Sequence, residues 1–122
     1  MKELPAFLAL LFVSGSPALA FQGGDWVLAQ YRGGSYWYPG IVNSNNGQTV
    51  TLTYDDGDKE TRPVNQVKVY SWRVGSPVEC NWRSAGKFYP GRIVGLSGQS
   101  LTLVYDQDRV QETTSTGNCR SR

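Results

Sequence analysis

A long internal repeat constrains the fold of this chain more than any other feature of its sequence. The segment WYPGIV at residues 37–42 returns as FYPGRI at residues 88–93, a shift of 88 minus 37, or 51, residues. Between residues 24–55 and the copy at residues 75–106, twelve of 32 positions are identical, and no gap is needed. A unit this long that occurs only twice does not fit a solenoid, so the repeat predicts two small domains in tandem.

The first 20 residues differ in character from the rest of the chain. Lys2 precedes an apolar run over residues 4–13, which is shorter than the roughly 20 residues that span a bilayer, and the segment ends in ALA at residues 18–20. This order is typical of a secretory signal peptide cleaved after Ala20, with a core helix or a membrane anchor as the alternatives. We therefore expect a signal peptide at residues 1–20, domains at residues 21–70 and 71–122, and a secreted or periplasmic protein without a membrane span.

Short segments with alternating apolar and polar residues occupy most of the chain after residue 25. Val50, Leu52 and Tyr54, for example, alternate with threonines, which is the pattern of a half-buried strand. The NNG sequence at residues 45–47 predicts a hairpin turn, and the second copy repeats the same order of strands and turns. Five short, bent strands in about 50 residues cannot form a sandwich. We therefore expect an all-β protein with two tandem five-stranded barrels of the SH3-like type.

Two features predict how the domains are held together. The join at residues 70–75 is short, so the domains are expected to dock, with Trp72 as a candidate contact. Cys80 and Cys119 both lie in the second half, and an even count in an exported chain favours a disulfide over free thiols. Such a bond would stabilise the fold by about 3 to 4 kcal/mol. Because residues 115–122 are polar throughout, the sequence leaves open whether the second domain has its own fifth strand or shares one with the first.

The composition limits the chemistry that the protein can perform. The chain contains no histidine, which excludes imidazole triads and histidine-liganded metal sites. The carboxylates of residues 55–60 and 106–112 lie in predicted hairpin turns where nothing orients them, and no phosphate-binding loop or nucleophile motif is present. We therefore expect a protein that is not an enzyme and that carries no cofactor or metal.

The order of the motifs resembles that of Tudor and Agenet domains. In the first unit, WYPGIV is followed by TLTYDDGDKE at residues 51–60; the second unit has FYPGRIVGL at residues 88–96, but its YDQD at residues 105–108 lacks the glycine of the acidic turn. The resemblance covers nearly all of residues 21–122. It implies two tandem Tudor-like barrels, here in an exported bacterial version. Eukaryotic tandem Tudor proteins bind methylated lysine or arginine.

The resemblance also implies an aromatic cage, because the faces of aromatic rings attract a poorly hydrated methylated ammonium. In the first unit the cage positions fall on three tyrosines and one acid: Tyr31, Tyr38, Tyr54 and Asp56. In the second unit the same ring positions fall on Trp82, Tyr89 and Tyr105. There Gln107 replaces the acid and Arg109 stands at the rim, where its charge disfavours a cation. The first unit is therefore the stronger candidate. Alternatively, these rings simply fill two small cores.

Three hypotheses for the function follow. The first is a binding module that takes a cationic or methylated amine, or a peptide that carries one, in aromatic-lined pockets. The second is binding of an anionic polymer, either nucleic acid or polysaccharide, by the second domain, because residues 71–122 contain 7 basic and 4 acidic residues. The third is a structural scaffold for protein interactions. Salt separates the first two hypotheses, since polymer binding falls steeply with ionic strength.

Overall fold

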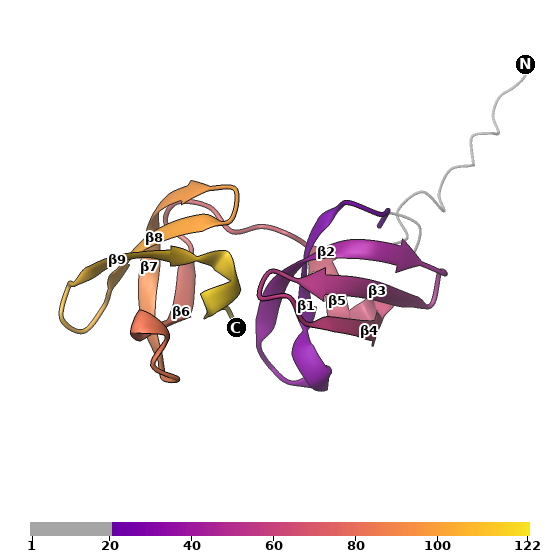
Figure 1. The fold of residues 1–122 in the computed structure, drawn as a ribbon, viewed down its shortest axis with the longest axis horizontal. Helices are drawn as coiled ribbons and strands as arrows, with labels where there is room; N and C mark the ends of the chain where they lie inside the picture. The colour runs from indigo at the N-terminus through magenta and orange to yellow at the C-terminus, as the bar shows by residue number, and fades with distance from the viewer. Residues whose placement is uncertain (1–20) are drawn as a thin grey trace, which may run out of the picture.

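A computed structural model describes residues 21–122, so the predicted signal peptide at residues 1–20 lies outside the described residues. Two five-stranded antiparallel sheets follow one another along the chain (Figure 1). Within residues 21–122 the only helical elements are short 3₁₀ turns, and no helix has the length and hydropathy to cross a bilayer. The prediction of an all-β protein with a tandem repeat is confirmed.

The first sheet is built from strands that are neighbours in sequence. It contains β1 (Trp26–Gln30), β2 (Trp37–Asn45), β3 (Thr49–Tyr54), β4 (Lys59–Pro63) and β5 (Val67–Val69). Their order across the sheet is β4-β3-β2-β1-β5. The alternation predicted for β3 is present, because its apolar residues are buried and its threonines are partly exposed. Two 3₁₀ turns complete the unit, η2 (Tyr31–Gly33) after β1 and η3 (Val64–Gln66) before β5.

The second sheet repeats this arrangement. It contains β6 (Pro77–Asn81), β7 (Phe88–Ser97), β8 (Ser100–Tyr105), β9 (Gln111–Ser115) and β10 (Cys119–Arg120), in the order β10-β6-β7-β8-β9. The turns η4 (Trp82–Ser84) and η5 (Thr116–Asn118) follow β6 and β9. The polar tail therefore supplies its own fifth strand, and the described sheets do not exchange strands.

The sheets do not close into barrels, which corrects the predicted architecture. In each unit the two edge strands are joined by a 3₁₀ turn and not by a hydrogen-bonded ladder: η3 joins β4 to β5, and η5 joins β9 to β10. These last strands are short, with three residues in β5 and two in β10. Each unit is instead an open sheet that is irregular at a bulge in its longest strand, at residues 42–44 in β2 and 93–95 in β7. We call residues 21–70 the first unit and residues 71–122 the second unit.

The glycine of the repeated Pro-Gly pair allows two strands to approach closely. A Cβ atom on Gly40 would lie 2.8 Å from the backbone oxygen of Thr53, and one on Gly91 would lie 2.6 Å from that of Val104. Contacts this short with backbone are not tolerated by a side chain, so only glycine fits at both places. The glycine of the strongest repeated motif therefore has a packing role.

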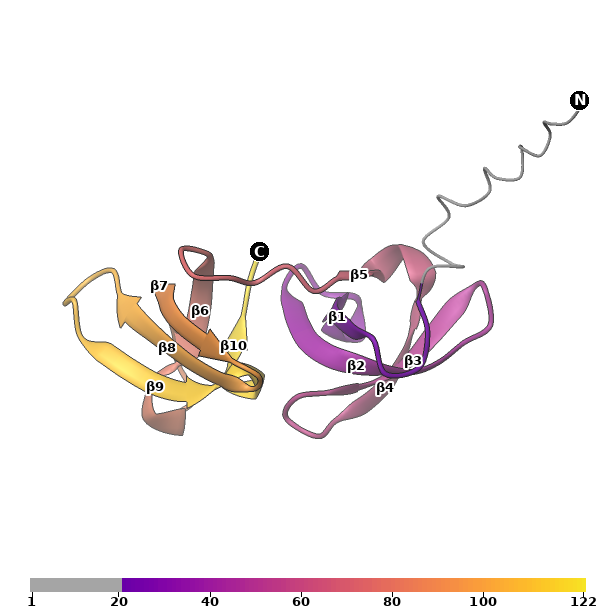
Figure 2. The same ribbon diagram turned by 90° about the horizontal axis from the view of Figure 1, so that it is seen from above.

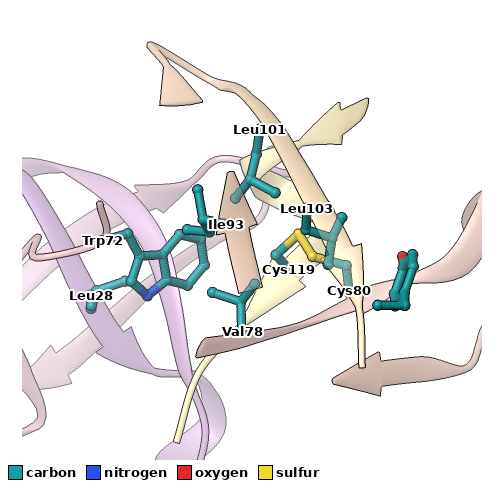
Figure 3. Close-up of a cluster of buried hydrophobic side chains, with 9 residues drawn as sticks. Leu28, Trp72, Val78, Cys80, Ile93, Leu101, Leu103 and Cys119 are labelled. Carbon is teal, nitrogen blue, oxygen red and sulfur yellow. A yellow bond between two sulfur atoms is a disulfide. The ribbon is translucent and has the colours of Figure 1, made fainter. Parts of the chain in front are cut away.

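Trp72 connects the cores of the two units. Its side chain is 6% exposed and belongs to a cluster that includes Leu28 of β1 and, from the second unit, Val78 and Ile93 (Figure 3). The indole N–H donates a hydrogen bond to Ser121 Oγ at 3.1 Å. The prediction that the units dock with Trp72 at the contact is confirmed.

The C-terminal segment, residues 116–122, packs against both units, and the C-terminus lies between them (Figures 1 and 2). The predicted disulfide is present and joins Cys119 of β10 to Cys80 of β6. Ser121 then bridges to Trp37 of β2, because its N–H donates to the Trp37 carbonyl at 2.9 Å and its carbonyl accepts from the Trp37 N–H at 2.7 Å. At the start of the segment, Thr116 Oγ donates to Asp55 Oδ2 at 2.6 Å. The C-terminal segment thus belongs to the second sheet and contacts the first.

Candidate functional site

The first strand of each unit ends in a tight turn that begins with an aromatic residue. Tyr31 begins η2 and Trp82 begins η4. The next residues, Arg32 and Arg83, have φ angles of 53° and 50°. This left-handed conformation costs a non-glycine residue about 1 to 2 kcal/mol, so each turn requires a contact that compensates for the strain.

A glutamate supplies that contact in each unit and connects the turn to a second ring. Glu60 accepts hydrogen bonds from the backbone N–H of Arg32, at 3.0 and 3.2 Å, and from the Tyr54 hydroxyl at 2.7 Å. In the second unit, Glu112 accepts from the backbone N–H of Arg83 at 3.0 Å and from the Tyr105 hydroxyl at 2.6 Å. Each glutamate therefore fixes the positions of two of the three predicted site rings.

These hydrogen bonds affect the tyrosines electrostatically as well. Burial raises the pKa of Tyr54 and of Tyr105, and the hydrogen bond to the neighbouring glutamate raises both further. Both phenols remain neutral at physiological pH and donate to their carboxylates. The Tyr54 and Tyr105 rings are thus anchored by their hydroxyl ends.

The two glutamates do not share the spacing of the sequence repeat, because the second unit has a one-residue insertion before Glu112. Glu112 follows Glu60 by 112 minus 60, or 52, residues, because the turn between β8 and β9 is one residue longer than the turn between β3 and β4. The Tyr54 N–H donates to the carbonyl of Asp58, whereas the Tyr105 N–H donates to the carbonyl of Val110. Val110 is therefore the counterpart of Asp58, and Arg109 lies within the longer turn. A search for a tyrosine and a glutamate on paired strands would have found both glutamates.

The three tyrosines predicted for the first-unit site do come together. The ring centroids of Tyr31 and Tyr38 are 5.8 Å apart, those of Tyr31 and Tyr54 are 5.5 Å apart, and those of Tyr38 and Tyr54 are 6.3 Å apart. The planes cross at 68° to 86°, so each ring turns an edge toward the face of a neighbour. Tyr31 and Tyr38 also pack against the core of the first unit. Asp56 is exposed in the following turn, where its Oδ1 accepts from the N–H of Asp58 at 3.0 Å.

The corresponding rings of the second unit line an open cavity. Trp82 and Tyr105 make an edge-to-face contact at 5.5 Å and 89°, while the side chain of Tyr89 is 38% exposed. The cavity has a volume of about 340 Å³, and its lining consists of Trp82, Tyr89, Pro90, Tyr105, Gln107 and Asp108. We call this cavity the second-unit notch. It contains all three aromatic residues that the sequence predicted there, together with a carboxylate that the sequence analysis did not assign to it.

The C-terminal segment explains why the two sites differ. In the first unit, Pro39 is buried, and the Tyr38 hydroxyl accepts a hydrogen bond from Arg120 Nη1 at 3.3 Å. The turn that follows Tyr54 is covered as well, because a Cβ on Gly117 would lie 2.8 Å from the backbone of Asp55. In the second unit, Pro90 and Tyr89 are exposed. The two units thus share the same strands and turns, but the aromatic surface is covered in the first unit and open in the second.

Arg120 is held between two other aromatic rings, outside both predicted sites. Its guanidinium carbon lies 3.7 Å from the ring centroid of Tyr36 and 4.1 Å from that of Phe88, so one ring from each unit contacts it. Glu79 accepts from its Nε at 3.2 Å and its Nη2 at 3.1 Å. Burial acts to lower the pKa of Arg120, but hydrogen bonds to Tyr38 and Glu79 outweigh it and the pKa is raised. The protein therefore already holds one cation between aromatic rings and a carboxylate.

No protein-family model matches the sequence, and no curated protein matches it. The structure is similar to the crystal structure of the Crb2 tandem tudor domains, with a TM-score of 0.58, 17% identity, and coverage of 81% of this chain and 78% of that one. It is also similar to the ADCP1 tandem Agenet domain 3-4, with 13% identity, coverage of 93% and 91%, and a TM-score of 0.42. A third similar structure is Arabidopsis thaliana AGDP1 AGD34, with 13% identity, coverage of 91% and 90%, and a TM-score of 0.43. The similarity to Crb2 shows that the two sheets have the tandem Tudor-like fold.

Proposed function

We propose that this tandem Tudor-like chain is a non-enzymatic binding module that takes a methylated or similarly poorly hydrated amine, presented by a peptide, into the second-unit notch. The observation that carries the proposal is the set of aromatic residues, Trp82, Tyr89 and Tyr105, around one cavity with Asp108 in its lining. Ring faces attract a cation without hydrogen-bonding it, and a carboxylate adds attraction at longer range.

Size and polarity support an amine over a purely apolar ligand. A cavity of about 340 Å³ is large enough to admit one long side chain and lies at the lower end of ligand-pocket volumes. An unmodified ammonium is strongly hydrated and loses that hydration on entering a ring-lined site, whereas a methylated ammonium loses less. We therefore expect the notch to prefer the methylated form.

The tyrosine cluster of the first unit, with Asp56 beside it, is the second site in this proposal. Its rings contact one another edge to face, and the Tyr38 hydroxyl is engaged by Arg120. A ligand that uses all three tyrosines would have to displace this contact. The first site is therefore expected to bind more weakly than the notch while the C-terminal segment stays in place.

The disulfide supports the proposed export of the protein. Disulfides form and persist in oxidising compartments and are rare in the cytosol. The Cys80–Cys119 bond is buried at both ends, with each cysteine 0% exposed. A periplasmic or secreted location is the proposal that fits such a bond, and the ligand would then be an amine or a peptide of that compartment.

The test is a proton–nitrogen NMR titration of residues 21–122 with trimethyl-lysine, with unmodified lysine, and with a short DNA strand at two salt concentrations. We expect shifts around Trp82, Tyr89 and Asp108 with trimethyl-lysine, smaller shifts with lysine, and little effect of salt. Shifts with DNA alone that vanish at high salt would instead favour the anionic-polymer hypothesis. No shift with either amine would overturn the proposal.

A matched pair of variants locates the site. Tyr89→Ala removes one wall of the notch and should weaken trimethyl-lysine binding about fivefold to thirtyfold, as expected for the loss of one cation–π contact. Tyr38→Ala removes the equivalent ring of the first unit and should leave this affinity unchanged. The opposite result would assign the ligand to the first unit.

A further inference from the structure

A second cavity adjoins the notch, and no role has been assigned to it so far. It has a volume of about 300 Å³ and lies where the C-terminal segment meets β6 and β7. Its apolar part includes Pro77, Val78 and Pro90, and its charged part consists of Glu79, Asp106 and Arg122. We call this cavity the adjoining cleft.

The notch and the adjoining cleft share a wall. Pro90 lines both cavities and is exposed. The turn after β8 runs along the same wall, since the N–H of Asp106 donates to the carbonyl of Pro90 at 3.0 Å. This turn places Asp106 in the lining of the cleft and Asp108 in the lining of the notch. The two cavities therefore form one continuous surface with an acid in each part.

The charges of the adjoining cleft favour a cationic occupant. Asp106 is exposed and makes no ion pair within residues 21–122. Glu79 is already engaged by Arg120 at 3.1 Å and by Arg122 at 3.6 Å. Asp106 is thus the carboxylate that remains available, and the prolines and Val78 offer an apolar bed for the methylenes of a long side chain.

The two cavities adjoin at Pro90, so side chains of one extended peptide can enter both. In an extended chain, residues i and i+2 point to the same side and lie about 6.6 Å apart along the strand. A ligand with its methylated amine in the notch would place its second residue along the chain, in either direction, over the cleft.

Resting on the proposed function, we propose that the ligand is an extended peptide in which a lysine or arginine stands two residues from the methylated amine and occupies the adjoining cleft beside Asp106. The notch recognises the methylated group and the cleft reads the sequence next to it. The site thereby prefers a dicationic segment to an isolated methylated amine.

Three capped peptides, each titrated into residues 21–122, test the inference. They are trimethyl-lysine-Gly-Gly, trimethyl-lysine-Gly-Lys and trimethyl-lysine-Gly-Leu. Calorimetric or NMR titration at low salt should show the Gly-Lys peptide binding about threefold to tenfold more tightly than the Gly-Gly peptide. A fourth peptide, trimethyl-lysine-Lys-Gly, directs its lysine to the other side and should match the Gly-Gly peptide. If the Leu peptide gains as much as the Lys peptide, the cleft is an apolar pocket and the inference is wrong.

Two variants with opposite expected effects complete the test. Asp106→Asn should abolish the gain of the Gly-Lys peptide while leaving binding of the Gly-Gly peptide unchanged. Arg122→Ala removes a positive charge from the cleft lining, where its side chain is 71% exposed, and should increase the gain. Equal binding of all four peptides would overturn this inference alone, whereas failure of the Gly-Gly peptide to bind would overturn the proposed function.

Discussion

The two units are copies of one skeleton, yet they present their aromatic residues differently. Both have the strained turn after the first strand and the glutamate that accepts from it, and both have a tyrosine hydroxyl anchored on that glutamate. In the first unit the rings pack against each other, and the Tyr38 hydroxyl accepts a hydrogen bond from Arg120. In the second unit they line an open notch. The turn and the glutamate, which both units share, hold the rings in place. The C-terminal segment, which engages Tyr38 of the first unit, decides whether a ligand reaches them.

Removing the disulfide has the largest expected effect on stability, and it should affect the two units unequally. Replacing Cys80 and Cys119 together by alanine is expected to lower the free energy of unfolding by about 3 to 4 kcal/mol, because the link closes a long loop in the unfolded chain. The loss should concentrate in the second unit, whose β10 is tied to β6 by this bond. Urea denaturation followed by amide signals of Leu52 and Leu103 would report the two units separately.

The same variant also tests the covering of the first-unit tyrosines. With β10 loosened, Arg120 should leave Tyr38, and the first unit should bind trimethyl-lysine more tightly than in the parent protein. The parent protein under oxidising and reducing conditions serves as the control. An unchanged unfolding midpoint after loss of the disulfide would contradict the predicted loss of stability. Unchanged trimethyl-lysine binding by the first unit would contradict the predicted covering.

The shared tyrosine–glutamate pair should respond alike in both units. Tyr54→Phe and Tyr105→Phe each remove a hydrogen bond to a carboxylate, and each should lower the free energy of unfolding by about 2 kcal/mol. Tyr89→Phe, on an exposed ring, is the control and should change little. A large effect in one unit only would mean that the two anchors are not equivalent.

These tyrosines also predict a pH dependence. The pKa of Tyr54 and of Tyr105 is raised by burial above the ordinary value of 10.0, and burial raises that of Tyr70 to about 12. A group with a raised folded-state pKa contributes stability that is complete below its unfolded pKa and is lost above it. Thermal melts should therefore show stability falling as pH rises from 10 to 12. The Tyr54→Phe, Tyr105→Phe double variant should lose less over this range.

The smallest expected effect concerns the contact that only the first unit makes. Thr116→Val removes the hydrogen bond to Asp55 Oδ2 and should cost about 1 kcal/mol at neutral pH. Burial is the main cause of the raised pKa of Asp55, and the Thr116 bond partly opposes it, so the pKa should rise further in the variant. Below pH 3.8 the Asp55 carboxyl becomes protonated in both the folded and the unfolded protein. Urea melts at pH 3 should therefore show a smaller loss in the free energy of unfolding than melts at pH 7. Equal losses at both pH values would contradict this account.

The strands, the tandem arrangement and the disulfide could be predicted because each leaves a local or countable signal in the sequence. Alternation along β3 marks one buried face, and two cysteines in one unit allow a single pairing. The open edges of the sheets could not be predicted, because alternation reports burial and does not say whether β4 and β5 meet.

The candidate site was predictable only in part, for a related reason. The aromatic positions repeat at a spacing of 51 residues and are visible in the sequence, whereas the anchoring glutamates shift to 52 and escape a fixed-spacing comparison. The contact between Thr116 and Asp55 joins residues 61 apart and has no periodic signature. The covering of one site and the opening of the other therefore became visible only in three dimensions.

The position of β10 has a consequence for the order in which the chain can fold during synthesis. All strands of the first sheet lie between residues 26 and 69, so this sheet can assemble while the second is still being made. The second sheet needs β10, which follows every other described strand in the sequence and pairs with β6. A nascent chain that stops short of Cys119 would therefore hold a finished first unit, an unsealed second one, and a free thiol at Cys80. That thiol is a chemical mark of a second sheet that has not yet gained β10.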